Sequence, residues 1–329
     1  MSSVSGPAST HLPGALGALG ALDARAPTAP VAGATPATAA AAGTAPAPPA
    51  GWRAHLQLRF ESSAGATRLT RRRHEGPLLV QRTFHPEALR GARGARGAEG
   101  PCHVYLIHPP GGMVGGDHLR LSLEVAPEAH ALLTTPAAGK FYRHGAAGPA
   151  RLTQSLAVRG RLEWLPQENI FYPDCVAEVC TRVDLAAEGR FMGWEVGCLG
   201  LPAIARGLGD GRVWQGFELY RDGRPLLLER QRITGECLHA CWGLRGHAAF
   251  GSCLAYPVRD AVLELARTRA AQLMDAELTL GCTLVDEVLC CRGFARRADR
   301  LRAAFVQLWT TLRPLLFGRD AVPPRIWAT

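Results

Sequence analysis

The sequence predicts a mainly β protein, with many short strands in a β-helical or layered β architecture and two α-helices near the C-terminus. Two observations carry this prediction. Segments that alternate apolar and polar residues with period two follow one another, separated by short turns, for about 200 residues. Apolar residues at helical spacing occur only near the end of the chain. With 329 residues, 47% of them hydrophobic, the chain can bury a substantial core.

Residues 1–50 are a mixture of Ala, Pro, Gly, Thr and Ser, and we expect them to be disordered because they lack the apolar content that offsets ordering entropy. Residues 51–329 are expected to form a single domain. The repeat 91–97 is typical of a flexible insertion. Alternating or apolar segments predict strands at 52–60, 67–74, 78–82, 102–108, 119–125, 129–135, 150–158, 161–165, 176–185, 191–199, 212–220 and 226–234.

The end of the chain is expected to hold two helices, at 259–271 and 295–316. The second places its apolar residues on one face: Leu301, Phe305, Leu308, Trp309 and Leu312. We also expect part of the aromatic surface of Trp309, Phe317 and Trp327 to be uncovered in the isolated chain and to mark an association site.

A glycine-rich loop at 108–117 precedes the strand 119–125. Its glycines and prolines exclude a helix interior or a central strand. It is not a P-loop, because Gly116 is followed by Asp117 and His118 instead of Lys and Ser or Thr, and a carboxylate repels phosphate. The loop delivers Asp117 to the start of a half-buried strand, which makes Asp117 the first candidate site residue.

The formal charge of +9 comes from arginines spread along the chain, with Lys140 as the single lysine. No RNA-recognition, helix-turn-helix or zinc-finger motif accompanies them, so we expect no nucleic-acid partner, whereas acidic protein partners fit the charge. The ten cysteines lack disulfide spacing, and no signal peptide or membrane-length apolar stretch occurs. These features predict reduced thiols, a cytoplasmic location and no membrane partner.

Three glutamates lie within apolar or aromatic segments: Glu163, Glu195 and Glu229. A carboxylate with such neighbours is paired, faces water or lines an internal polar passage, because an unpaired buried charge is costly. Arg230 is a poor partner for Glu229, since adjacent strand residues point to opposite faces.

Metal chemistry remains open at this point. Three histidines flank the glycine loop: His103, His108 and His118. Cys237 and Cys241 could hold a soft metal, but neither spacing matches a recognised metal site. A metal-dependent hydrolase that uses Asp117 with a nearby His and Glu is one alternative, and a plain protein-interaction module is another.

Five segments resemble one known family in collinear order over residues 51–329. They are HPPGGMVGGD at 108–117, TPAAGKFYR at 135–143, LEWLPQE at 162–168, GWEVGCLG at 193–200, and the final pair LRP and VPPRIWAT. Together these segments resemble the UreD family of urease accessory proteins, also called UreH.

The resemblance implies a non-enzymatic, cytoplasmic metallochaperone scaffold. Such a scaffold binds the accessory protein UreF, which recruits the GTPase UreG, and the assembly delivers nickel to apo-urease for assembly of the nickel metallocentre. A homodimer of this heteromeric complex is compatible with the resemblance. Nickel is then in transit, and GTP acts only through the partner GTPase. The resemblance also implies an internal passage lined by acidic side chains, and Asp117, Glu195 and Glu229 fall on its matching positions.

Overall fold

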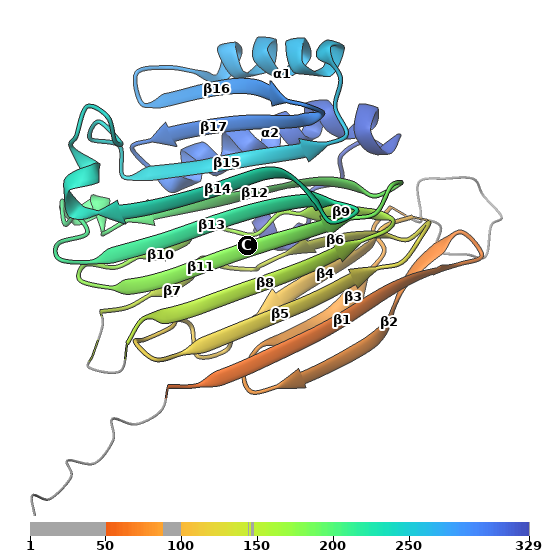
Figure 1. Cartoon of the computed structure of the whole chain (residues 1–329), viewed down its shortest axis with the longest axis horizontal. Helices are drawn as coiled ribbons and strands as arrows, with labels where there is room; N and C mark the ends of the chain where they lie inside the picture. The colour runs from red at the N-terminus through yellow and green to blue at the C-terminus, as the bar shows by residue number, and fades with distance from the viewer. Residues whose placement is uncertain (1–50, 88–99, 144, 146–147, 329) are drawn as a thin grey trace, which may run out of the picture. The chain divides into compact units, whose positions relative to one another are not determined.

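The chain passes back and forth between two β-sheets, and this alternation builds the fold (Figure 1). The computed structural model describes residues 51–87, 100–143, 145 and 148–328. The disorder expected for residues 1–50 and the flexible insertion expected at 91–97 therefore lie outside the described residues.

The first sheet has seven strands in the order β14-β13-β11-β8-β5-β1-β2. Pairing is parallel from β1 through β5, β8 and β11 to β13, and antiparallel at both edges. Its strands are β1 (Arg53–Ser63), β2 (Ala66–Glu75), β5 (His118–Val125), β8 (Ala150–Val158), β11 (Val176–Leu185), β13 (Arg212–Arg221) and β14 (Arg224–Thr234).

The second sheet has ten strands, with the main order β16-β17-β15-β12-β9-β6-β4-β3 and the short β10 and β7 beside β12. The strands are β3 (Leu79–Phe84), β4 (Cys102–Ile107), β6 (His130–Thr134), β7 (Gly139–Phe141), β9 (Arg161–Trp164), β10 (Asn169–Phe171), β12 (Arg190–Leu199), β15 (Ala249–Tyr256), β16 (Leu278–Val285) and β17 (Val288–Ala295). Since β4, β5 and β6, like β11, β12 and β13, lie in alternate sheets, the architecture is both β-helical and layered, as predicted.

Two helices, α1 (Asp260–Leu273) and α2 (Ala298–Phe317), pack on the ten-stranded sheet near the C-terminus, as predicted. Short 3-10 turns cover Pro202–Ile204, Gly235–Leu238 and Arg325–Ala328. In the described part of the chain, no helix is long and apolar enough to cross a membrane. All ten cysteines are free thiols.

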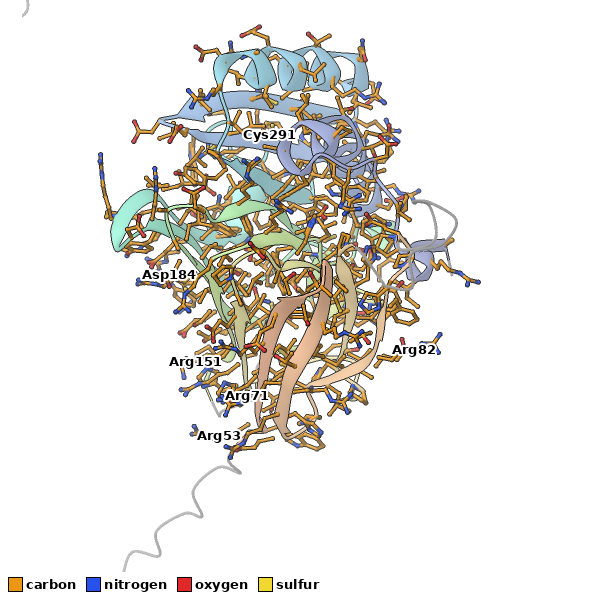
Figure 2. The ribbon with its side chains drawn as sticks, turned by 90° about the vertical axis from the view of Figure 1, so that its right-hand side faces the viewer. Arg53, Arg71, Arg82, Arg151, Asp184 and Cys291 are labelled. Atoms are coloured by element: carbon orange, nitrogen blue, oxygen red, sulfur yellow. The ribbon has the colours of Figure 1, made fainter. Side chains whose placement is uncertain are left out.

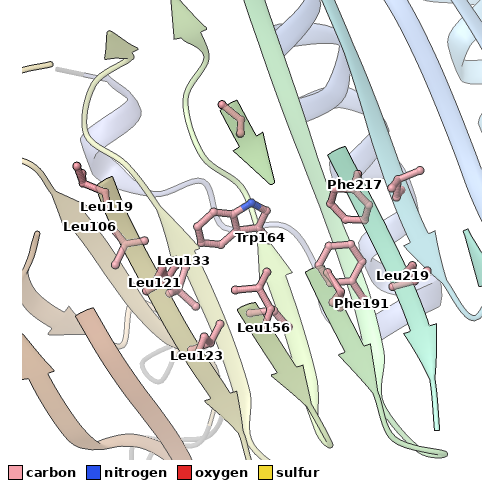
Figure 3. Close-up of a cluster of buried hydrophobic side chains, with 14 of the residues drawn as sticks. Leu106, Leu119, Leu121, Leu123, Leu133, Leu156, Trp164, Phe191, Phe217 and Leu219 are labelled. Carbon is pink, nitrogen blue, oxygen red and sulfur yellow. The ribbon is translucent and has the colours of Figure 1, made fainter. Parts of the chain in front are cut away.

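Two hydrophobic cores result, one between the sheets and one between the ten-stranded sheet and the helices. The β12 strand contributes to both, because alternate residues point to opposite faces: Phe191 joins the first core and Trp194 the second. Figure 3 shows the core between the sheets, where Trp164 lies between Leu121 on one side and Phe191 and Phe217 on the other. The functional candidates also lie in this space.

The prediction of an uncovered aromatic surface is wrong for Trp309 and Phe317, because both side chains are buried. The C-terminal segment folds back so that Trp327 is half-buried, with its Nε1 donating to Thr134 Oγ1 at 2.8 Å and its ring 5.9 Å from that of Trp309. Sequence periodicity identified the apolar face of α2 but could not show that the last turn of the chain helps to cover it.

Candidate functional site

Polar side chains interrupt the apolar core between the sheets, and strand register brings them together. In the seven-stranded sheet one register row crosses four strands: Gln154, Thr181, Phe217 and Glu229. The facing row of the ten-stranded sheet holds Glu195, Ser252 and Arg292. Residues opposite each other in register share a face of the sheet. Two carboxylates from different sheets therefore lie in the same interior space.

Glu195 lies at the centre of this arrangement and is 5% exposed. The Thr181 hydroxyl contacts Glu195 Oε1 and also lies 2.5 Å from Gln154 Oε1, while Gln215 Nε2 donates to Glu195 Oε2 at 2.9 Å. Burial and the charge of Glu229 together raise the pKa of Glu195 to about 7, against the lowering effect of its hydrogen bonds. Since Thr181 has a single proton and faces two acceptors, a proton on Glu195 completes the hydrogen-bond chain.

Glu229 lies at the outer end of the same space. Arg292 Nε donates to Glu229 Oε1 at 2.6 Å, and Ser252 Oγ donates to Glu229 Oε2 at 3.2 Å. The Glu229 side chain is 12% exposed and that of Arg292 is 44% exposed, so the pair spans from the interior to the surface. Arg230 pairs instead with Glu218 at 3.1 Å, which confirms that the neighbouring arginine is not the partner of Glu229.

Two cavities meet at Glu195. The larger, about 470 Å³, extends from Glu195 to the glycine loop, with apolar walls such as Leu121 and Trp164 from both sheets. Its polar lining groups are His108, Thr135, Lys140, Gln154, Gln167 and Asn169. The smaller, about 10 Å³, lies between Glu195 and Glu229 and has room for roughly one water. Glu195 lines both cavities, and Glu229 lines the smaller one.

Asp117 lies at the end of the glycine loop, and its carboxylate binds backbone amides. Trp52 N donates to Oδ1 and Val114 N to Oδ2, each at 2.8 Å. Asp117 is not among the described residues that line either cavity. The loop itself does form a wall, and it needs Gly112 there because a Cβ would lie 2.3 Å from the Tyr142 ring. Asp117 thus shapes one end of the larger cavity.

The three histidines near the loop do not converge. His103 is buried, with Nε2 at 2.9 Å from Glu87 Oε1, whereas His118 contacts Thr153 on the outer face of the sheet. His108 lines the larger cavity, and burial lowers its pKa. Throughout the part of the chain that the structure describes, no group of three or more His, Cys, Asp or Glu side chains could hold a metal ion.

The cysteine pair does not form a joint site either. Cys237 is buried, and its Sγ lies 3.4 Å from the backbone N of Thr234. Cys241 is exposed.

A second group of buried charges was missed by sequence reasoning. Glu163 on β9 accepts hydrogen bonds from His130 Nε2 at 2.7 Å, Trp309 Nε1 at 2.5 Å and Arg313 Nε at 2.8 Å. Arg313 also donates to Glu87 Oε1 at 2.7 Å. Burial alone would raise the pKa of Glu163, but the His130 hydrogen bond and the Arg313 charge outweigh it and hold that pKa well below its usual range.

The sequence did contain a signal for this network. Arg313 follows Trp309 by four residues, so it falls on the apolar face of the predicted helix. A charged residue on a buried helix face requires a partner of opposite charge, and Glu163 in its apolar segment was an available candidate.

The sequence is similar to those of proteins from one known family. A family model described as UreD urease accessory protein matches residues 53–328. A urease accessory protein UreD from Escherichia coli is 40% identical over 285 residues, which cover 85% of this chain and 98% of that protein. One from Pseudomonas putida (strain W619) is 43% identical over 284 residues, covering 85% and 95%. One from Alcanivorax borkumensis is 38% identical over 286 residues, covering 85% and 93%. The chain belongs to the family of UreD urease accessory proteins.

Proposed function

We propose that this protein is a cytoplasmic scaffold of urease maturation that binds UreF and UreG and passes nickel through the space between its two sheets to apo-urease. Nickel is the cargo, and GTP is bound and hydrolysed only by the partner GTPase. Family membership supports the role in urease maturation. The observation that supports the nickel proposal is that two cavities between the sheets meet at Glu195, and that Glu229 lines the smaller of them.

The chemistry of the passage suits a divalent cation in transit. Carboxylate and amide oxygens can replace water ligands of nickel one at a time, and they bind nickel less tightly than a set of imidazoles or thiolates would. Glu195 and Glu229 lie on either side of the narrow cavity, with Gln215 and Gln231 beside them. Two carboxylates without a further charged ligand make a weak site, which transit requires.

The proposal extends to Asp117, which fixes the loop that walls the larger cavity but is not among the described residues that line it. Its two backbone hydrogen bonds give it a structural role as well, so its variant needs a folding control. The hydrolase alternative gains no support from this geometry, because Asp117 faces backbone amides while His118 faces the outer surface of the sheet.

The experiment that tests the proposal is nickel loading of apo-urease in vitro with purified components. Glu195→Gln, Glu229→Gln and the double variant remove charge with little change in volume, and the double variant is expected to lower nickel per urease active site at least about tenfold. Glu264→Gln, which removes the charge of an exposed glutamate on α1, is the matched control. A pull-down of UreF and UreG with each variant reports binding separately.

Full nickel loading by the double variant would contradict the passage. Lost binding of the partner proteins would instead assign the two glutamates to the fold or to an interface. Asp117→Asn should reduce both nickel loading and thermal stability, because it weakens two hydrogen bonds that fix the loop.

A further inference from the structure

The seven-stranded sheet has an uncovered outer face. Its inner face packs on the ten-stranded sheet, and both helices lie on the far side of that second sheet. Parallel sheets normally have both faces covered, so an exposed parallel face of five strands is unusual. In Figure 2, Arg53, Arg71, Arg151 and Asp184 project along the same side of the molecule.

Strand register gathers arginines on this face that are far apart in sequence. One row crosses six strands: Arg53, His118, Arg151, Glu178, Trp214 and Arg232. The adjacent row on the same face consists of Glu75, His55, Arg120, Thr153, Cys180, Gly216 and Arg230. We call these two rows the basic rows. They contain five arginines and two glutamates, an excess of three positive charges at one end of the sheet.

Three of these arginines have no neutralising partner. Arg53, Arg120 and Arg232 are exposed and form no ion pair with any described residue, whereas Arg151 pairs with Glu178 at 2.6 Å. The neighbouring histidine responds to this excess: burial first, and then the charges of the surrounding arginines, lower the pKa of His118. The basic rows therefore present a region of positive potential with unused hydrogen-bond donors.

The first row includes an aromatic side chain. Trp214 is 37% exposed, and the Arg232 guanidinium lies 6.0 Å from the centroid of its ring. Exposed tryptophan and arginine are the residues most enriched in the central contacts of protein interfaces. Six neighbouring strands span about 24 Å, which is wide enough for one side of a standard interface.

We propose that the basic rows dock an acidic surface of a partner protein in the urease maturation assembly. That the partner belongs to the urease maturation assembly rests on the proposed function. That the basic rows bind an acidic surface does not. Glu178 lies inside the first row and Glu218 beside the second, and both would repel the continuous phosphates of a nucleic acid. A protein surface of mixed charge can instead place a basic side chain near each carboxylate and a carboxylate near each free arginine.

The test compares two triple variants of the full chain that lose the same charge. Arg53→Gln, Arg120→Gln and Arg232→Gln neutralise the basic rows, whereas Arg206→Gln, Arg245→Gln and Arg296→Gln neutralise exposed arginines elsewhere. Association rate constants are measured on immobilised apo-urease, UreF and UreG separately, at low and high salt. The row variant is expected to associate about tenfold more slowly with one of these proteins at low salt. Screening should reduce the difference at high salt.

Equal rates for the two triple variants with all three proteins would overturn the inference, as would slower binding only to a DNA duplex. A wild-type chain that binds none of the three proteins would contradict the proposed function instead. In that case the binding of the two triple variants to poly-L-glutamate tests the inference. Weaker binding by the row variant than by the control variant supports recognition of an acidic polypeptide, and equal binding rejects it.

Discussion

At the scale of one residue, the protonation of Glu195 makes the stability of the fold depend on pH. Its folded-state pKa of about 7 exceeds the reference value of 4.5, so the folded protein holds this proton more tightly than the unfolded chain does. The stabilising contribution of the group is therefore fully present below pH 4.5 and is lost as pH rises through about 7.

Glu195→Gln should remove this pH dependence. The amide can donate to Thr181 and accept from Gln215, as a protonated Glu195 does. Relative to wild type, the variant is expected to gain about 3 kcal/mol of unfolding free energy between pH 5 and pH 8. Urea unfolding at a series of pH values measures this difference. Glu178→Gln is the control. If the unfolding free energy of Glu195→Gln depends on pH in the same way as that of wild type, Glu195 does not hold the proton.

Arg292 occupies the position at Glu229 that a cation in transit would need. A nickel ion that bound Glu229 would compete with the guanidinium for the same carboxylate oxygen. Arg292→Gln is therefore expected to raise nickel affinity about tenfold, because a charge-assisted hydrogen bond no longer has to break. Isothermal titration with nickel measures the effect. Arg182→Gln, which removes an ion pair with Asp184 on the outer face, is the control, and equal affinities would reject competition at Glu229.

At the scale of elements, α2 is attached to the ten-stranded sheet by buried charge as well as by apolar packing. Glu163→Gln leaves Arg313 with one fewer carboxylate partner and should lower the unfolding free energy by about 3–5 kcal/mol. The double variant Glu163→Leu with Arg313→Met should lose less than the sum of the single losses, since neither Glu163 nor Arg313 is then left without the other, and Glu87 keeps His103 as a partner. Denaturant unfolding measures both losses.

Glu264→Gln is the control for this network. It removes an exposed ion pair with Arg267 on α1 and should change the unfolding free energy by less than about 0.5 kcal/mol. Strictly additive losses in the double variant would show that Glu163 and Arg313 do not act as a pair.

Most elements could be predicted from the sequence, because each has a hydrophobic period of its own. The strand β11 alternates clearly along Val176–Leu185, and the apolar face of α2 repeats at helical spacing. By contrast, β15, β16 and β17 were not predicted. Ala249–Tyr256 and most of Val288–Ala295 are buried on both faces and show no alternation, whereas Leu278–Val285 does alternate. The three-residue strands β7 and β10 are too short to carry a periodic pattern.

At the scale of the whole molecule, the described residues supply both hydrophobic cores, beginning at Ala54. Deletion of residues 1–50 is therefore expected to change the unfolding free energy by no more than about 0.5 kcal/mol, as surface changes do. Differential scanning calorimetry of the truncated and full-length chains tests this. A large drop in Tm would show that the first fifty residues pack against the domain.

The candidate site was only partly predictable, because its geometry depends on contacts between distant segments. Glu195 and Glu229 were selected by their apolar surroundings and by the family resemblance. Glu163 has similar surroundings, but its partners His130 and Arg313 lie 33 and 150 residues away in sequence. The basic rows likewise exist only once the parallel strands are in register, so the arginines look scattered in the sequence.

The two cavities lie across the strands. The larger is lined from β4, β5, β8, β9 and β12, and the smaller from β12 to β15. The number of strands that lie side by side would therefore set the length of a route through both cavities. The distance between the two sheets would set its width. Duplication of one β-helical turn, which adds one strand to each sheet, would lengthen the route by the spacing of neighbouring strands, about 5 Å, without widening it. The length and the width of such a route can therefore change independently: added strands would lengthen it, while the small cavity between Glu195 and Glu229 would stay the same.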